Sequence, residues 1–239
     1  WARSLTLGTG QFCTNPGVVV ALEGDGLEAF LDAADEVLAG VPAQAMLTPG
    51  IAGAYRRAVD ARTGEAALSK RAARAPASET PGTCHVTPAV FETTAAAFLA
   101  SHALQEEVFG PAALVLRCRS EDERLAVAAT LEGQLTATLL MEPGDAGDMT
   151  TARKLVPVLE RKAGRLLVNG FSTGVEVCHS MMHGGPYPAS TDTRSTSVGS
   201  RAILRFLRPV AYQNLPAELL PEGLGDDSEG PRLVDGTPR

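Results

Sequence analysis

Short apolar runs alternate with longer helical patterns along this chain of 239 residues, and the alternation limits the folds open to it. Residues 18–22 (VVVAL) and 165–169 (RLLVN) have the length and composition of strands, and residues 134–141 are weakly β-rich. Between them, residues 26–41 place apolar side chains at helical spacing, and residues 145–163 form a helical stretch that Pro157 is expected to bend. Strands separated by helices are typical of a parallel sheet covered by helices. The pattern therefore predicts an α/β fold.

Local signals mark further elements. Thr48 followed by proline predicts the N-cap and first turn of a helix that ends near residue 61. Ser120 opens a capping-box sequence, SEDE, which predicts a helix to residue 131. Residues 84–92 are predicted to form one strand, and residues 72–82, rich in Ala, Pro, Ser and Gly, a loop.

The composition argues against several classes of function. The chain has 21 basic and 28 acidic residues, a net charge of −7, and only 5% aromatic residues. Such a chain does not suit a nucleic-acid or an anionic membrane surface. No apolar run approaches the roughly 20 residues of a membrane span, and no signal peptide is recognisable. The four cysteines show neither C-x-x-C nor zinc spacing, so we expect reduced thiols in a cytoplasmic protein without a metal site.

One cysteine stands in a setting suited to a nucleophile. Residues 10–17 read GQFCTNPG, so small and polar residues surround Cys13, and the strand-like run 18–22 follows directly. A thiol reacts as its thiolate, which needs a polar and partly exposed setting. On the local sequence alone, a loop cysteine without a role is an equally good interpretation.

A second motif favours the nucleophile. Residues 106–111 read EEVFGP and precede the apolar run 112–116. Together, GQFCT and EVFGP resemble the nucleophile motif G-Q-x-C-T and the cofactor-contacting motif E-x-F-G-P of the aldehyde dehydrogenase superfamily, in the family's order. Residues 183–191 (HGGPYPAST) and 196–210 resemble the substrate side of its branch acting on α-ketoglutarate semialdehyde. The resemblance extends from about Leu5 to Gln213.

The resemblance implies a reaction and the residues that carry it. Cys13 would add to an aldehyde, a hydride would pass to NAD or NADP, and water would hydrolyse the resulting thioester to a carboxylate. Glu107 would accept hydrogen bonds from the nicotinamide ribose, and Phe109 would pack near the nicotinamide. His179 and His183 would lie at the substrate entry. Taken alone, the second motif favours a solvated loop acid at Glu107 and a core aromatic residue at Phe109, and the Cys13 motif at the matching distance upstream reverses that preference.

The resemblance also implies that part of the machinery lies outside these residues. The family's oxyanion asparagine and its E-L-G-G-like general-base motif have no counterpart here, and Gly8-Thr9-Gly10 is only half of a dinucleotide-binding fingerprint. Because the chain also opens on Trp1, we interpret it as a piece of a longer protein without the N-terminal dinucleotide-binding domain. We expect the isolated chain to have little or no dehydrogenase activity, and NAD or NADP to be bound mainly by sequence outside it.

The expected organisation has three parts. Residues 1–200 would form the catalytic α/β domain, in which residues 170–200 lack a regular period and are therefore expected to be functional. Residues 201–214 contain a predicted strand, 203–210, which in the family would serve oligomer contacts, so we expect a homo-oligomer, dimer or tetramer, as the full-length protein. Residues 215–239 would form an irregular tail with little core.

Two other functions stay open. One is cysteine-dependent acyl transfer or ester hydrolysis without nicotinamide, in which one of the four histidines (His85, His102, His179 and His183) would help Cys13 to ionise, although none lies in a hydrolase signature. The other is a non-catalytic assembly module that acts through residues 203–210. If the substrate is an acidic aldehyde, Arg194 and Arg201 are candidates for binding its carboxylate, with a surface cation as the plain alternative.

Overall fold

The structure, a computed structural model, describes residues 1–71, 83–225 and 229–238, so the loop predicted at 72–82 lies outside the described residues. The chain divides into two compact units, residues 1–202 and 203–239. The first unit contains, in chain order, α1 (Ala2–Thr6), the 3₁₀ helix η1 (Leu7–Gly10), β1 (Val18–Leu22), α2 (Asp25–Ala39), β2 (Gln44–Ala45), α3 (Pro49–Thr63), β3 (Ser69–Lys70), β4 (His85–Val86), β5 (Ala89–Thr94), α4 (Ala95–Ala100), η2 (His102–Gln105), β6 (Ala112–Cys118), α5 (Glu121–Thr130), β7 (Gln134–Leu139), α6 (Ala146–Leu159) and β8 (Ala163–Val168).

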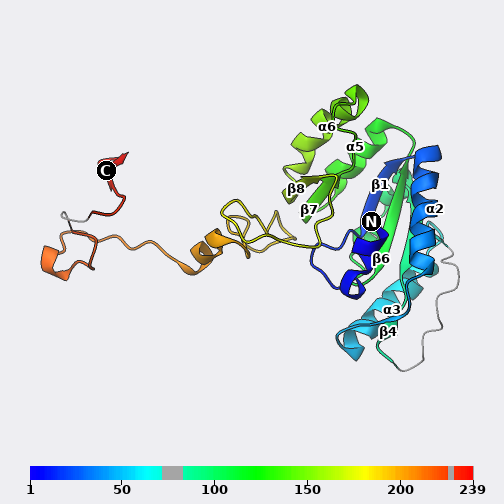
Figure 1. The fold of residues 1–239 in the computed structure, drawn as a ribbon, viewed down its shortest axis with the longest axis horizontal. Helices are drawn as coiled ribbons and strands as arrows, with labels where there is room; N and C mark the ends of the chain where they lie inside the picture. The colour runs from blue at the N-terminus through cyan, green and yellow to red at the C-terminus, as the bar shows by residue number, and fades with distance from the viewer. Residues whose placement is uncertain (72–82, 226–228, 239) are drawn as a thin grey trace. The chain divides into compact units, whose positions relative to one another are not determined.

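A four-stranded sheet with the order β1-β6-β5-β3 forms the centre of the first unit (Figure 1). β6 runs parallel to β1 on one side and to β5 on the other, while β3 is an antiparallel edge strand. β7 and β8 form a separate parallel pair. β5 and β6 are buried along nearly their whole length, whereas β1 is mostly half-buried. Parallel strands connected by helices confirm the predicted α/β fold.

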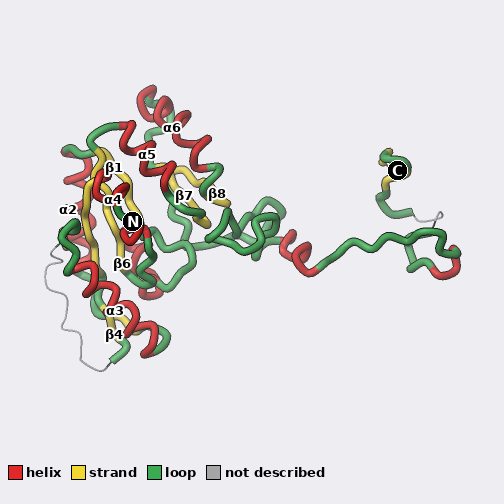
Figure 2. The backbone as a smooth tube through the Cα atoms, turned by 180° about the vertical axis from the view of Figure 1, so that it is seen from behind, coloured by secondary structure: helices red, strands yellow, loops and turns green. Residues whose placement is uncertain are grey.

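Helices cover both faces of the central sheet (Figure 2). Val90 and Val115 point to one face, where they pack against α1 and α2. Phe91 and Leu114 point to the other face and pack with Phe98 of α4 and with residues of α5. This division follows from the strand period of two, which sends neighbouring side chains to opposite faces. Among the described residues, no helix has the length and apolar character needed to cross a membrane.

The predicted helix starts are confirmed, whereas one predicted strand is divided. The Ile51 N–H donates to Oγ1 of Thr48 (3.2 Å), and the Glu123 N–H donates to Oγ of Ser120 (3.2 Å). The single strand predicted over 84–92 is wrong, because β4 pairs with β2 while β5 pairs with β6. Pro88 lies between β4 and β5 and has no N–H to continue a ladder.

The strand predicted over residues 203–210 is also wrong. Residues Ser200–Phe206 form the 3₁₀ helix η3, and residues 207–210 have no regular structure. A strand needs a neighbour for its backbone groups, and none of the described strands pairs with this segment. The rest of the second unit contains η4 (Ala217–Leu219) and the short antiparallel pair β9 (Leu233–Val234) and β10 (Thr237–Pro238).

Candidate active site

Gly10 lets the two sequence motifs touch. The chain leaves α1 through Gly8, Thr9 and Gly10, which all have left-handed backbone angles, with φ of 56°, 59° and 64°. A Cβ added to Gly10 would lie 2.3 Å from the carbonyl carbon of Gly110. Only glycine therefore allows the loop that carries Cys13 to lie directly against the loop that carries Glu107 and Phe109.

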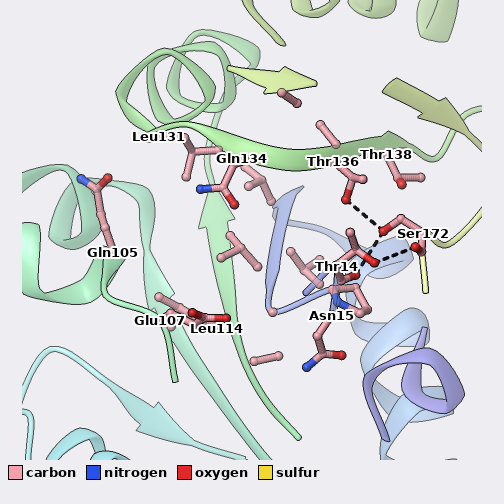
Figure 3. A pocket seen from close by; sticks show the side chains of 18 of the residues that line it. Thr14, Asn15, Gln105, Glu107, Leu114, Leu131, Gln134, Thr136, Thr138 and Ser172 are labelled. Carbon is pink, nitrogen blue, oxygen red and sulfur yellow. Dashed lines mark hydrogen bonds between the residues drawn. The ribbon is translucent and has the colours of Figure 1, made fainter. Parts of the chain in front are cut away.

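Hydrogen bonds hold the Cys13 loop on both sides. The Asn15 side-chain amide donates to the Gly110 carbonyl (2.9 Å), which adds a second link to the other motif. Thr14 Oγ1 donates to the Ser172 carbonyl (2.6 Å), and Ser172 Oγ donates to the Thr14 carbonyl (3.1 Å). Ser172 Oγ also lies 2.9 Å from Oγ1 of Thr136 on β7, so the three side chains form a polar cluster (Figure 3). Thr14 and Ser172 are buried, whereas Cys13 stays exposed.

A cleft of about 970 Å³ lies between β1 and β7, and Cys13, Glu107 and Phe109 all line it. Figure 3 shows Glu107 on the loop that borders this cleft, across from the Thr14–Ser172 cluster. Phe109 exposes 40% of its surface. Glu107 is exposed, and its carboxylate has no hydrogen-bond or ion-pair partner among the described residues. The structure thus places three residues that the motifs singled out around one cavity.

His183 lies against the thiol. Its Nε2 is 3.1 Å from Sγ of Cys13, although 170 positions separate the two residues. Burial, and then the positive charge of Arg165 on β8, lower the pKa of His183, so the ring is neutral at pH 7. Its Nδ1 is buried and has no hydrogen-bond partner within the described ranges. Sequence reasoning placed His183 at the substrate entry but did not identify Arg165, since no local motif marks that residue.

The other candidate histidines and arginines do not contact Cys13. Nδ1 of His179 contacts Oγ of Ser200 (2.7 Å), and His102 pairs with Glu132 (3.1 Å). Arg194 is 92% exposed at its side chain and pairs with Asp192. Neither His179, Arg194 nor Arg201 lines the cleft. Of the four histidines, His183 is the one that contacts Cys13.

The sequence matches known proteins over nearly its whole length. A sequence model described as the aldehyde dehydrogenase family matches residues 1–205. The alpha-ketoglutaric semialdehyde dehydrogenase 2 of Azospirillum brasilense is 54% identical over 235 residues, which are 98% of this chain and 44% of that protein. The alpha-ketoglutaric semialdehyde dehydrogenase of Acinetobacter baylyi is 40% identical over 236 residues, again 98% of this chain and 44% of that protein. The chain thus spans less than half the length of these relatives.

Solved structures show the same fold at low sequence identity. The delta-pyrroline-5-carboxylate dehydrogenase from Mycobacterium tuberculosis superimposes with a TM-score of 0.68 at 17% identity, over 91% of this chain and 41% of that one. Betaine aldehyde dehydrogenase from Staphylococcus aureus, solved in complex with NAD+, gives a TM-score of 0.64 at 16% identity, over 86% of this chain and 40% of that one. At such identities the likeness supports the arrangement of strands and helices and no finer conclusion.

Proposed function

This chain belongs to the aldehyde dehydrogenase family, and from that premise we propose that it is the thiol-bearing catalytic portion of an enzyme that oxidises an acidic aldehyde to a carboxylate with NAD or NADP. The observation that carries the proposal is the exposed Cys13 in a cleft shared with Glu107 and Phe109. α-Ketoglutarate semialdehyde is the proposed substrate, because it appears in the names of the relatives at 54% and 40% identity.

Cys13 forms the covalent bond to the substrate. Its Sγ attacks the aldehyde carbon and gives a tetrahedral hemithioacetal, which becomes a thioester on Cys13 after the loss of hydride and is then hydrolysed. The backbone N–H of Cys13 donates no hydrogen bond within the described residues. It is therefore available to stabilise the negative charge on the substrate oxygen.

The cleft fits the nicotinamide half of a dinucleotide, whose chemical contribution when bound is to accept the hydride. The unpartnered Glu107 carboxylate can accept hydrogen bonds from two ribose hydroxyls, and the exposed ring of Phe109 offers an apolar surface to the nicotinamide. The chain contains no complete glycine fingerprint for the phosphates. We assign phosphate binding, and with it the choice between NAD and NADP, to sequence outside these residues.

A chimaeric protein tests this function. This chain replaces the matched region in the Azospirillum relative, and NAD(P)H formation from α-ketoglutarate semialdehyde is followed by absorbance. We expect turnover in the chimaera, a loss of about 10³-fold or more in its Cys13→Ala variant, and little or no turnover by the isolated chain. Equal turnover by the chimaera and its Cys13→Ala variant would refute the assignment of Cys13, provided that circular dichroism shows both to be folded.

The contact between Cys13 and His183 keeps one alternative open, cysteine-dependent acyl transfer or ester hydrolysis without nicotinamide. The chain alone, given p-nitrophenyl acetate and no cofactor, separates the two functions. Repeated turnover that disappears in Cys13→Ala would favour the alternative. A single acylation of Cys13 that then stops would favour the dehydrogenase, whose hydrolytic base is expected outside this chain.

We further propose that the whole protein forms a homo-oligomer, dimer or tetramer, in the cytoplasm. Exposed apolar side chains support the proposed oligomer. They are 53–81% exposed and belong to Ile203, Leu204, Phe206 and Leu207. None of the four cysteines forms a disulfide, which fits a reducing compartment. Light scattering of the chimaera gives its mass, and a mass unchanged by Phe206→Glu would argue against this segment as the interface or as an assembly module.

A further inference from the structure

We infer that His183 is the base that takes the thiol proton of Cys13, an inference that rests on the proposed role of Cys13 as the nucleophile. The two side chains are at hydrogen-bond distance, with 3.1 Å between Nε2 and Sγ. A thiol reacts only after it loses its proton, and an imidazole at this distance is the group best suited to receive it.

The backbone of His183 is anchored, so the contact does not depend on a freely moving loop. The His183 N–H donates to Oγ1 of Thr196 (2.8 Å), and Thr196 is buried. The His183 carbonyl accepts from both the N–H (3.0 Å) and the Oγ (2.9 Å) of Ser197. Three hydrogen bonds therefore hold the residue from one neighbouring segment.

Gly184 and Gly185, which follow His183, pack closely against the backbone of β8 and β7. A Cβ added to Gly164, on β8, would lie 2.1 Å from the carbonyl oxygen of Gly184. Gly185 has φ of 158°, and a Cβ there would lie 2.4 Å from the carbonyl oxygen of Gln134, at the start of β7. These close approaches fix the segment on β7 and β8. Thr136 of β7 also contacts Ser172, which lies beyond the end of β8 and holds the Cys13 loop through Thr14.

The surroundings of the ring direct its chemistry to the thiol. Nδ1 is buried without a partner among the described residues, which leaves Sγ of Cys13 as the polar contact of the ring. Arg165 is the charged side chain that acts on His183, and it helps to keep the ring neutral and able to accept a proton. Within the described ranges no carboxylate is bonded to the ring. In the part of the chain that the structure describes, the Cys13 thiolate is thus the one anion bonded to the imidazolium, which loses this partner when the sulfur reacts and then releases its extra proton.

Proton transfer from Cys13 to His183 produces the nucleophilic thiolate. The Sγ–H bond breaks, the proton moves to Nε2 of a neutral imidazole that already carries a proton on Nδ1, and the sulfur keeps the electron pair. The thiolate uses that pair to form the bond to the aldehyde carbon. The imidazolium then gives its extra proton to the solvent or to the substrate oxygen, which restores the neutral ring.

Alkylation of Cys13 by iodoacetamide tests this role in the 239-residue chain itself. The rate is measured from pH 5.5 to 10, with the labelled sites mapped by mass spectrometry, in the wild type and in His183→Ala and His183→Gln. Gln can keep a polar contact with the thiol and leaves the backbone anchors in place, but it cannot take a proton. His179→Ala is the matched control, since that histidine contacts Ser200 and not Cys13. Cys178 in the same protein serves as the internal reference.

We expect both His183 variants to slow the alkylation of Cys13 at pH 7 by about 10-fold or more, because each loses one charge-assisted hydrogen bond that stabilises the thiolate. The difference should disappear near pH 10, where thiols ionise without help. His179→Ala should match the wild type. A wild-type rate in His183→Gln, or a loss that is equal at every pH, would overturn the inference, because either result assigns His183 a purely structural contact.

The two proposals fail in different measurements. Cys13-dependent NAD(P)H formation in the chimaera with no effect of His183 on alkylation would leave the dehydrogenase function standing and refute the role of His183. A clear effect of His183 on alkylation in the 239-residue chain, together with a chimaera that is folded but forms no NAD(P)H, would support the thiol–imidazole pair and refute the proposed function.

Discussion

Replacing Gly10 by alanine should lower the free energy of unfolding by about 2 to 5 kcal/mol, because two separate penalties act at this position. At φ of 64° an L-residue is less stable by about 1–2 kcal/mol than in its ordinary conformation. The new Cβ would lie 2.3 Å from the carbonyl carbon of Gly110 and 2.4 Å from the nitrogen of Pro111, where ordinary contact begins at 3.4 Å. Both are backbone atoms that cannot rotate away, so the two loops must separate, which costs about a further 1–3 kcal/mol.

Urea unfolding measures this loss, and the fluorescence of Trp1, whose indole N–H donates to the Pro16 carbonyl beside the Cys13 loop, reports on it. Gly26→Ala is the matched control, because Gly26 lies in the first turn of α2 with no atom within 4 Å of an added Cβ. We expect that control to be unchanged or up to about 1 kcal/mol more stable. A Gly10→Ala protein within about 0.5 kcal/mol of the wild type would refute the close packing of the two motif loops.

Three further predictions concern buried or ionisable groups. Glu92 is 8% exposed, and its carboxylate accepts from Arg71 (2.8 Å) and Arg117 (2.6 Å). Glu92→Gln should therefore lower the free energy of unfolding by about 3 kcal/mol, and an unchanged urea midpoint would contradict this. Burial raises the pKa of Cys118 to about 11, so iodoacetamide at pH 8 should label it only after unfolding, and labelling of the native chain would show that the site is open. Burial and Arg165 lower the pKa of His183 in the folded chain, so the unfolded chain binds the proton more readily and stability should fall as the pH drops below about 6.5. Urea midpoints at pH 7.5 and 5.5 should therefore differ more in the wild type than in His183→Gln, and equal differences would contradict the assignment.

The central fold is predictable from the sequence because its signals are local. The run VVVAL at 18–22 is rich in β-branched residues, and both it and the apolar run 112–116 are short for helices. The two runs form adjacent parallel strands. Thr48 and Ser120 cap their helices through hydrogen bonds to residues three positions away. The same reasoning fails at residues 203–210, because an apolar run forms a strand only where another strand pairs with it, and local sequence does not show whether such a partner exists.

The candidate site is predictable only where a motif marks it. The two motifs indicated Cys13, Glu107 and Phe109, and the structure places all three around one cleft, while their roles remain proposals. The contact of His183 with Cys13 arises from tertiary structure alone. It depends on hydrogen bonds from Thr196 and Ser197, inside a segment with no regular period, which no pattern in the sequence expresses.

The unpaired edge of β1 affects how the isolated chain behaves in solution. Its five residues are all apolar, yet in the described structure it pairs with β6 alone, and Val18 is 46% exposed. An uncharged, proline-free edge is a template for the strands of other molecules, and natural proteins usually cover, bend or charge such edges. Concentrated solutions of the isolated chain should therefore aggregate through this edge. Aggregation then limits the protein concentration at which the chain can be measured.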